Sequence, residues 1–184
     1  MANITKKLIL QTFSDMLEEM PFDRITVSAL VKRSGISHNT FYYHYQDIYA
    51  LLETWMEEVI GEPLRMVEQG DGETALVSFL RSCRNKKRTV YHVLNSISRE
   101  QLERFVFSHT DTIILPFIQA NDPNHDLDEQ KLQCLADFCQ YALLGFFLKY
   151  FWSNMAEEPE SQAAWVYDAL VSFMRSEMKR MGSR

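Results

Sequence analysis

Three helix-length segments fall within the first 50 residues, and the residues between them are of kinds that end and begin helices. The first segment closes before Pro21, because the residue that precedes a proline disfavours the α conformation. Thr26 is a suitable N-cap for the second segment, and Gly35 follows it where a left-handed residue is wanted. Ser37 is the expected N-cap of the third segment. The short turn between the last two segments gives them the proportions of a helix-turn-helix.

The remaining sequence shows the same helical periodicity. No segment alternates apolar and polar residues as a half-buried strand does. The clearest loop is 121–126, which reads Asn-Asp-Pro-Asn-His-Asp. Apolar residues recur at helical spacing through further segments, namely 48–70, 73–85, 89–96, 99–118, 128–152 and 161–181. We therefore predict an all-α fold with about nine helices.

Composition is that of a folded helical protein and excludes several other classes. Hydrophobic residues make up 46% and charged residues 24% of the 184 residues, with only 6 Gly and 5 Pro, which excludes disordered, collagen-like and low-complexity chains. The 3 cysteines form no Cys-x-x-Cys pair, as expected in a reducing compartment. The most apolar stretch, 134–152, is interrupted by Asp137, Gln140 and Lys149, so no membrane segment is predicted. We expect a soluble, cytoplasmic protein.

The third segment has two unlike faces. At about 100° per residue, Phe41 faces the first two helices, whereas His38, Asn39, Tyr42 and Tyr43 lie on the outward arc. Amide, imidazole and phenol groups on one exposed arc suit hydrogen bonding to base edges in a DNA major groove, and Asn pairs bidentately with adenine. On spacing alone, an ordinary helical hairpin with a polar outer face remains an open interpretation.

The stretches 25–27 and 34–45, followed by Leu51 and Leu52, closely resemble the TetR family of bacterial transcription regulators. The shared pattern is a Thr that opens the second helix, a Gly-Val/Ile-Ser turn and an aromatic third helix, and the resemblance covers residues 4 to 60. It implies a homodimer that binds a double-stranded DNA operator through a helix-turn-helix domain, 1–47, followed by a larger helical domain for ligand binding and dimerisation, 48–184. The DNA-binding residues that it implies are Ser37, His38, Asn39, Thr40, Tyr42, Tyr43 and His44, with Thr26, Ser28 and Lys6 nearby.

One departure from the family pattern concerns charge. Many members have a Lys at the start of the fourth helix, aimed at a phosphate, where this chain has Ile48. The first 50 residues carry five basic and five acidic side chains, and the third helix has no Lys or Arg. We therefore expect weak non-specific binding, with specificity from polar base contacts. The same features favour an alternative, a helical ligand carrier or partner-binding protein whose DNA-binding head is not used.

The helix expected over 128–152 is apolar on more than one face, and 161–181 carries a comparable stripe. Such a helix must be covered on more than one side, by its own domain and by a partner subunit. By resemblance these two helices form a four-helix bundle in the dimer, although a monomer with a large core remains open. The candidate interface residues are Tyr141, Leu144, Phe147, Leu148, Phe151, Trp165, Ala169 and Phe173.

An effector site is implied by the family more than by any motif. The segment 86–96 is faintly similar to a subgroup related to regulators of dihydroxyacetone-kinase genes. The basic run 84–88 is either a solvated helix end or a contact for an anionic ligand or partner. The candidate contacts for an unidentified small-molecule effector, each of which is also a reasonable core or surface residue, are Trp55, Phe79, Tyr91, His92 and Asn95.

Enzymatic readings find no motif. Patterns such as GxSxG, GxxxxGK[ST], GxGxxG and HExxH are missing, so we predict no catalytic residue and no cofactor. His125, Asp126, Asp128 and Glu129 carry metal-binding atoms, but a polar loop of this kind is usually solvated, and no metal site is predicted. We therefore predict a transcription regulator, not an enzyme: a ligand-responsive repressor that binds an inverted-repeat operator as a homodimer.

Overall fold

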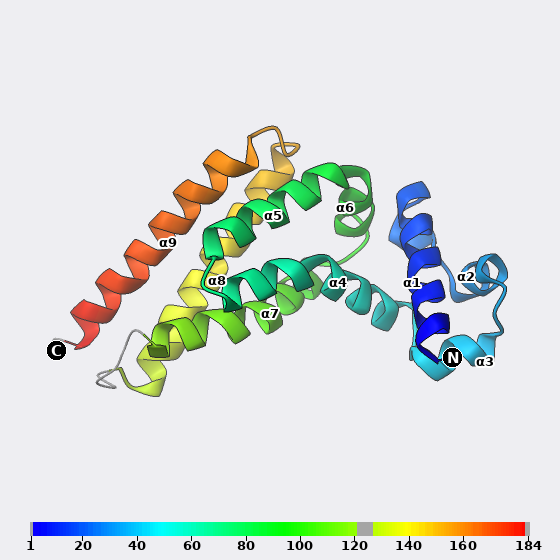
Figure 1. The fold of residues 1–184 in the computed structure, drawn as a ribbon, viewed down its shortest axis with the longest axis horizontal. Helices are drawn as coiled ribbons and strands as arrows, with labels where there is room; N and C mark the ends of the chain where they lie inside the picture. Colours follow the sequence, from blue (N-terminus) through cyan, green and yellow to red (C-terminus); the bar gives the residue numbers. More distant parts are fainter. Residues whose placement is uncertain (1, 121–126, 183–184) are drawn as a thin grey trace. The chain divides into compact units, whose positions relative to one another are not determined.

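The structure is a computed structural model that describes residues 2–120 and 127–182. These residues form nine α-helices and one short 3-10 helix and contain no strand (Figure 1), which confirms the all-α prediction. The predicted loop 121–126 lies outside the described residues. The helices are α1 (Ala2–Glu19), η1 (Phe22–Arg24), α2 (Val27–Ser34), α3 (His38–His44), α4 (Ile48–Glu68), α5 (Gly72–Asn85), α6 (Lys87–Leu94), α7 (Arg99–Ala120), α8 (Glu129–Trp152) and α9 (Pro159–Gly182).

Three elements differ in detail from the sequence prediction. The short helix η1, which buries Phe22, lies where only a link was expected. Helix α6 begins at Lys87 and ends at Leu94, a shift of two residues from the predicted 89–96. Helix α9 begins at Pro159 instead of residue 161, because a proline fits the first helical position, where its missing N–H is no loss.

The chain divides into two compact units. Unit 1 comprises Met1–Gly61 with Asn85–Arg99, and unit 2 comprises Glu62–Arg84 with Glu100–Arg184. Packing thus assigns the first part of α4 and all of α6 to the N-terminal unit. The boundary between residues 47 and 48 that the family resemblance implies stays a prediction.

The core of unit 1 joins α1, α2, α3, α4 and α6. Phe13, Leu30, Phe41 and Leu51 are fully buried at 0% exposure, and Val93 of α6 belongs to the same cluster at 4%. Figure 1 shows the short helices α2 and α3 beside α1. The recognition pair α2–α3 is therefore built on a continuous apolar base.

The core of unit 2 joins α7, α8 and α9. Ile118 and Cys139 are fully buried and pack with Leu135 and Met174. Helices α8 and α9 run antiparallel and lie side by side (Figure 1). Across the described ranges, no helix is long and apolar enough to cross a bilayer.

Candidate nucleic-acid interface

Both helices of the predicted recognition motif are capped as their sequence requires. The Thr26 hydroxyl accepts a hydrogen bond from the Ala29 N–H at 3.2 Å, at the start of α2. The Ser37 hydroxyl accepts one from the Thr40 N–H at 3.1 Å, at the start of α3. Gly35 ends α2 in the left-handed region with φ of 72°, where a side chain would be strained. These three residues fix the turn between the helices.

Helix α3 has one buried and one exposed face. Phe41 is fully buried, and its ring lies 5.9 Å from that of Tyr45. On the opposite side, Tyr42 is 56% and Tyr43 is 78% exposed, and Asn39 is also exposed. The outward arc expected from the sequence is therefore present, and its side chains are exposed in unit 1.

The two histidines of α3 are held differently. The ring of His38 is exposed, and its Nε2 lies 3.3 Å from the Ser28 hydroxyl, which links α2 to α3 at the surface. His44 is half-buried, with its ring 5.0 Å from that of Tyr43. This contact places the Ser28 hydroxyl and the His38 ring next to each other on the exposed surface of α2 and α3.

Lys6 of α1 approaches the same surface. Its Nζ lies 5.9 Å from the centroid of the Tyr45 ring, and its side chain is exposed. Tyr45 itself is buried, and its hydroxyl has no hydrogen-bond partner among the described residues. Burial raises the pKa of the Tyr45 phenol to about 12, with a smaller contribution from the Glu58 carboxylate. Tyr45 therefore stays uncharged at neutral pH, and the Lys6 ammonium group lies over its neutral ring.

The start of α4 offers a carboxylate in place of a cation. The Asp47 side chain accepts hydrogen bonds from the N–H groups of Tyr49 at 2.8 Å and Ala50 at 2.9 Å. Ile48 packs against the core of unit 1, which gives a structural reason for an apolar residue at this position. Because Asp47 already satisfies these N–H groups, the start of α4 is poorly suited to a phosphate.

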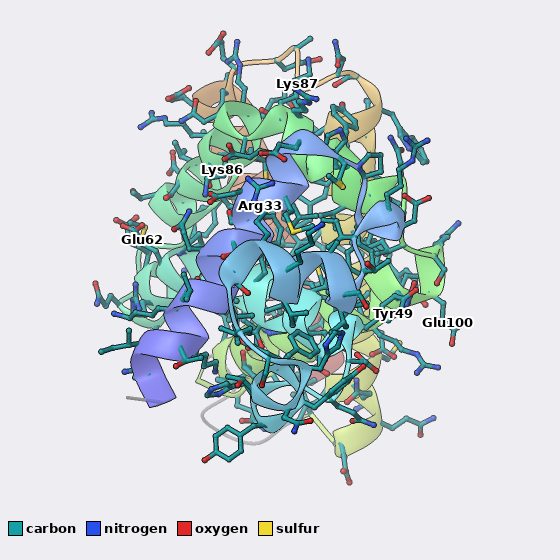
Figure 2. The ribbon with its side chains drawn as sticks, turned by 90° about the vertical axis from the view of Figure 1, so that its right-hand side faces the viewer. Arg33, Tyr49, Glu62, Lys86, Lys87 and Glu100 are labelled. Atoms are coloured by element: carbon teal, nitrogen blue, oxygen red, sulfur yellow. The ribbon has the colours of Figure 1, made fainter. Side chains whose placement is uncertain are left out.

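Part of the positive charge in unit 1 is used internally. Arg33 of α2 makes a bidentate ion pair with Glu19 of α1, with N–O distances of 2.5 and 2.7 Å. The hydrogen bond from Arg33 lowers the pKa of the Glu19 carboxyl. Lys86 and Lys87 lie at the top of the view in Figure 2, whereas α3 lies in its lower half. The exposed face of α3 is thus served mainly by neutral polar groups.

Two capped helices joined by a tight turn, the second with polar and aromatic side chains on its free face, define a helix-turn-helix DNA-binding domain. A family model for bacterial regulatory proteins of the tetR family matches residues 2–54, and a model for the C-terminal region of transcriptional regulators matches residues 72–170. The chain belongs to the TetR family and is a DNA-binding transcription regulator.

A solved structure described as the dihydroxyacetone kinase operon activator DhaS has a similar fold. It is 15% identical to this chain with a TM-score of 0.63, and the match covers 94% of this chain and 97% of DhaS. At this identity the likeness concerns the fold alone. No curated protein matches the chain.

Four of the predicted effector contacts belong to unit 1 and one, Phe79, belongs to unit 2. Trp55 is 6% exposed and belongs to the apolar core of unit 1, so its packing has a structural explanation. The His92 ring faces α1, and Asn95 and Tyr91 also belong to unit 1. Phe79 lies in unit 2, with its ring 5.0 Å from that of Phe147. The effector site therefore stays a prediction without a defined pocket.

The predicted dimer residues separate into buried and exposed sets. Leu144 and Phe151 were expected at the surface, but they are only 2% and 7% exposed and lie inside their own subunit. Phe147, Leu148 and Phe173 are half-buried. Tyr141, Trp165 and Ala169 are exposed, as are Phe138 and Trp152, which were not among the candidate interface residues.

The basic run 84–88 is largely explained by internal contacts. Arg84 pairs with Glu158 at 2.8 Å, which raises the pKa of the arginine, and neighbouring Arg81 pairs with Glu160. Arg88 donates a hydrogen bond to the Glu19 carbonyl of α1. Over 2–120 and 127–182, no three His, Cys, Asp or Glu side chains form a metal-binding group, and His125 and Asp126 lie outside these ranges.

Proposed function

We propose that the protein is a ligand-responsive repressor that binds an inverted-repeat operator as a cytoplasmic homodimer. The observation that carries the proposal is the exposed face of α3, where Asn39, Tyr42 and Tyr43 present polar groups away from the core. Side chains of this kind hydrogen-bond to base edges in the major groove, whereas Thr26 and Ser28 at the start of α2 suit phosphate oxygens.

The dimer part of the proposal is supported by the apolar surface of α8 and α9. A groove between these helices is lined mainly by apolar residues such as Phe138, Trp165 and Ala169, together with Lys149, Ser153, Glu157 and Gln162. Trp165 is 74% exposed, which is unusual for so large an apolar side chain unless another surface covers it. Two subunits paired through this face would present two α3 helices, as a two-fold operator with half-sites about 34 Å apart requires.

For the effector we propose an effect on the DNA-binding equilibrium but no binding site. A ligand shifts the DNA-binding equilibrium only by its differential affinity for the two states of the protein. The name of DhaS describes an activator, so the direction of regulation is an outcome of the test below.

The test is binding of the purified full chain to DNA fragments that flank its own gene. We expect a protected, inverted-repeat site in a footprinting experiment and a dimer bound to it. A reporter placed downstream of the site should be repressed by the protein, and increased expression would replace repression with activation. Failure to prefer any flanking fragment over a shuffled sequence would favour the alternative of a helical carrier with an unused head.

A further inference from the structure

Helix α6 belongs to unit 1 although it lies far from the other helices of that unit in the sequence. It packs along α1, and its Thr89 and Val93 are buried at 3% and 4% exposure. Ile97, just beyond the helix, packs against the same core. Apolar contact alone explains why α6 stays against α1, but it does not explain the polar contacts described next.

Two side chains of α6 reach the carbonyl groups at the end of α1. The last carbonyls of an α-helix have no partner within the helix. The His92 Nδ1 lies 2.7 Å from the Leu17 carbonyl oxygen, and Arg88 donates from Nη2 to the Glu19 carbonyl oxygen at 3.3 Å. Because a carbonyl oxygen only accepts, His92 carries its proton on Nδ1. Positively charged and N–H groups are also favoured here by the helix dipole.

The side chain of Glu19 brings a third element to the same place. Arg33 of α2 holds the Glu19 carboxylate through two hydrogen bonds, while Arg88 of α6 holds its carbonyl. The end of α1 is therefore fastened to α2 by one arginine and to α6 by another.

We propose that Arg88 and His92 are positioning residues for operator binding, and that they act by fixing the end of α1. This inference rests on the proposed function. Helix α1 supplies Phe13 and Leu17 to the core that supports Leu30 of α2 and Phe41 of α3. A change in the direction of α1 thus moves α3, and a dimer with two loosely held α3 helices fits two half-sites poorly.

The test compares full-length variants on operator DNA and on shuffled DNA of equal length. Arg88→Ala and His92→Leu each remove a donor to α1. We expect each to weaken operator binding roughly 3- to 10-fold, the range for one net hydrogen bond, with little change on shuffled DNA. His92→Asn keeps an N–H donor near the position of Nδ1 and should restore most of the lost affinity, as should Arg88→Lys.

The matched control is Val93→Ala, which removes buried apolar contact from α6 and leaves both donors in place. It should lower the thermal midpoint and leave operator affinity, measured well below that midpoint, near that of the unaltered protein. If Val93→Ala and His92→Leu have the same thermal midpoint and lose the same operator affinity, the proposal is overturned. Failure of His92→Asn to restore binding would also overturn it. Equal operator binding by every variant overturns only this inference. Absence of specific binding by the unaltered chain overturns both it and the proposed function.

Discussion

At the scale of single residues, the exposed side chains of α3 form two groups: those with a hydrogen-bond partner within unit 1 and those without one. Ser37 and His38 already have partners within unit 1, through the cap and the contact with Ser28. Asn39 and the hydroxyl of Tyr42 lie on the exposed face and make no hydrogen bond among the described residues, although the Tyr42 ring packs edge-on against Phe41 at 5.4 Å. Base recognition by α3 should therefore depend most on Asn39 and Tyr42.

We expect Asn39→Ala and Tyr42→Ala each to cost about 1–3 kcal/mol of operator binding per half-site, because each removes a direct base contact. The measurement is an equilibrium titration against the footprinted site. Gln11→Ala, on the exposed side of α1, is the control and should bind normally. Unchanged binding by both α3 variants would refute their assignment.

Tyr45 gives a prediction about stability and pH. Its buried hydroxyl lacks a partner among the described residues, so Tyr45→Phe should leave the free energy of unfolding unchanged or raise it. A tyrosine in the unfolded chain ionises at about pH 10, whereas the pKa of Tyr45 in the folded chain is about 12. The folded state therefore loses stability as pH rises from 10 to 12. Urea unfolding across this range should show a smaller loss in Tyr45→Phe, and an identical loss in both proteins would contradict the assignment.

At the scale of elements, substitutions of the α3 N-cap, Ser37, separate the stability of the helix from the effect of charge on DNA binding. Ser37→Ala removes the hydroxyl that accepts from the Thr40 N–H and should lower the free energy of unfolding by about 1 kcal/mol. Ser37→Asp keeps a capping oxygen and should retain stability. Its added negative charge should nevertheless weaken DNA binding. Urea unfolding and a DNA titration separate the two effects, and normal DNA binding by a stable Ser37→Asp would place α3 away from the phosphates.

The elements also show which parts of the structure were predictable. Thr26, Gly35 and Ser37 were identified correctly as helix-boundary residues because capping and left-handed backbone involve neighbours in sequence. The contact of His92 with Leu17 joins residues 75 positions apart, and periodicity carries no information about such a pair. His92 therefore looked equally suitable for an effector site.

Helix α8 illustrates the same limit for surfaces. Apolar residues occur around most of its circumference, so spacing did not distinguish the side covered by its own subunit from the side left open. Leu144 and Phe151 proved to be core residues, whereas Phe138 and Trp152 proved to be exposed. The neighbouring helices, among them α5, α7 and α9, make this distinction.

At the scale of the whole molecule, dimer formation is testable through Trp165. We expect Trp165→Glu to shift the protein toward monomers, because the change replaces the largest exposed apolar side chain of the groove between α8 and α9 with a charged one. Sedimentation velocity measures the shift, and Glu73→Gln on α5 is the control. Operator binding should fall with the dimer fraction. A dimer unaffected by the charge would place the interface elsewhere.

Salt dependence tests the charge balance of the DNA-binding surface. With Arg33 paired to Glu19, the first 50 residues keep four other basic side chains, or eight in a dimer. At about 0.9 per neutralised phosphate, the plot of log affinity against log salt should be no steeper than about −7. Titrations between 50 and 200 mM salt measure the slope, and a value near −10 would contradict the expected reliance on neutral contacts.

The place of α6 in unit 1 has a consequence for protein synthesis. Val93 and Ile97 reach the ribosome exit only after residues 62–84, which belong to the other unit, have been made. A nascent or prematurely ended chain that stops before α6 carries α2 and α3 but lacks the part of the core that Val93 and Ile97 contribute. We therefore expect such fragments to hold α1 less firmly and to compete poorly for operator DNA.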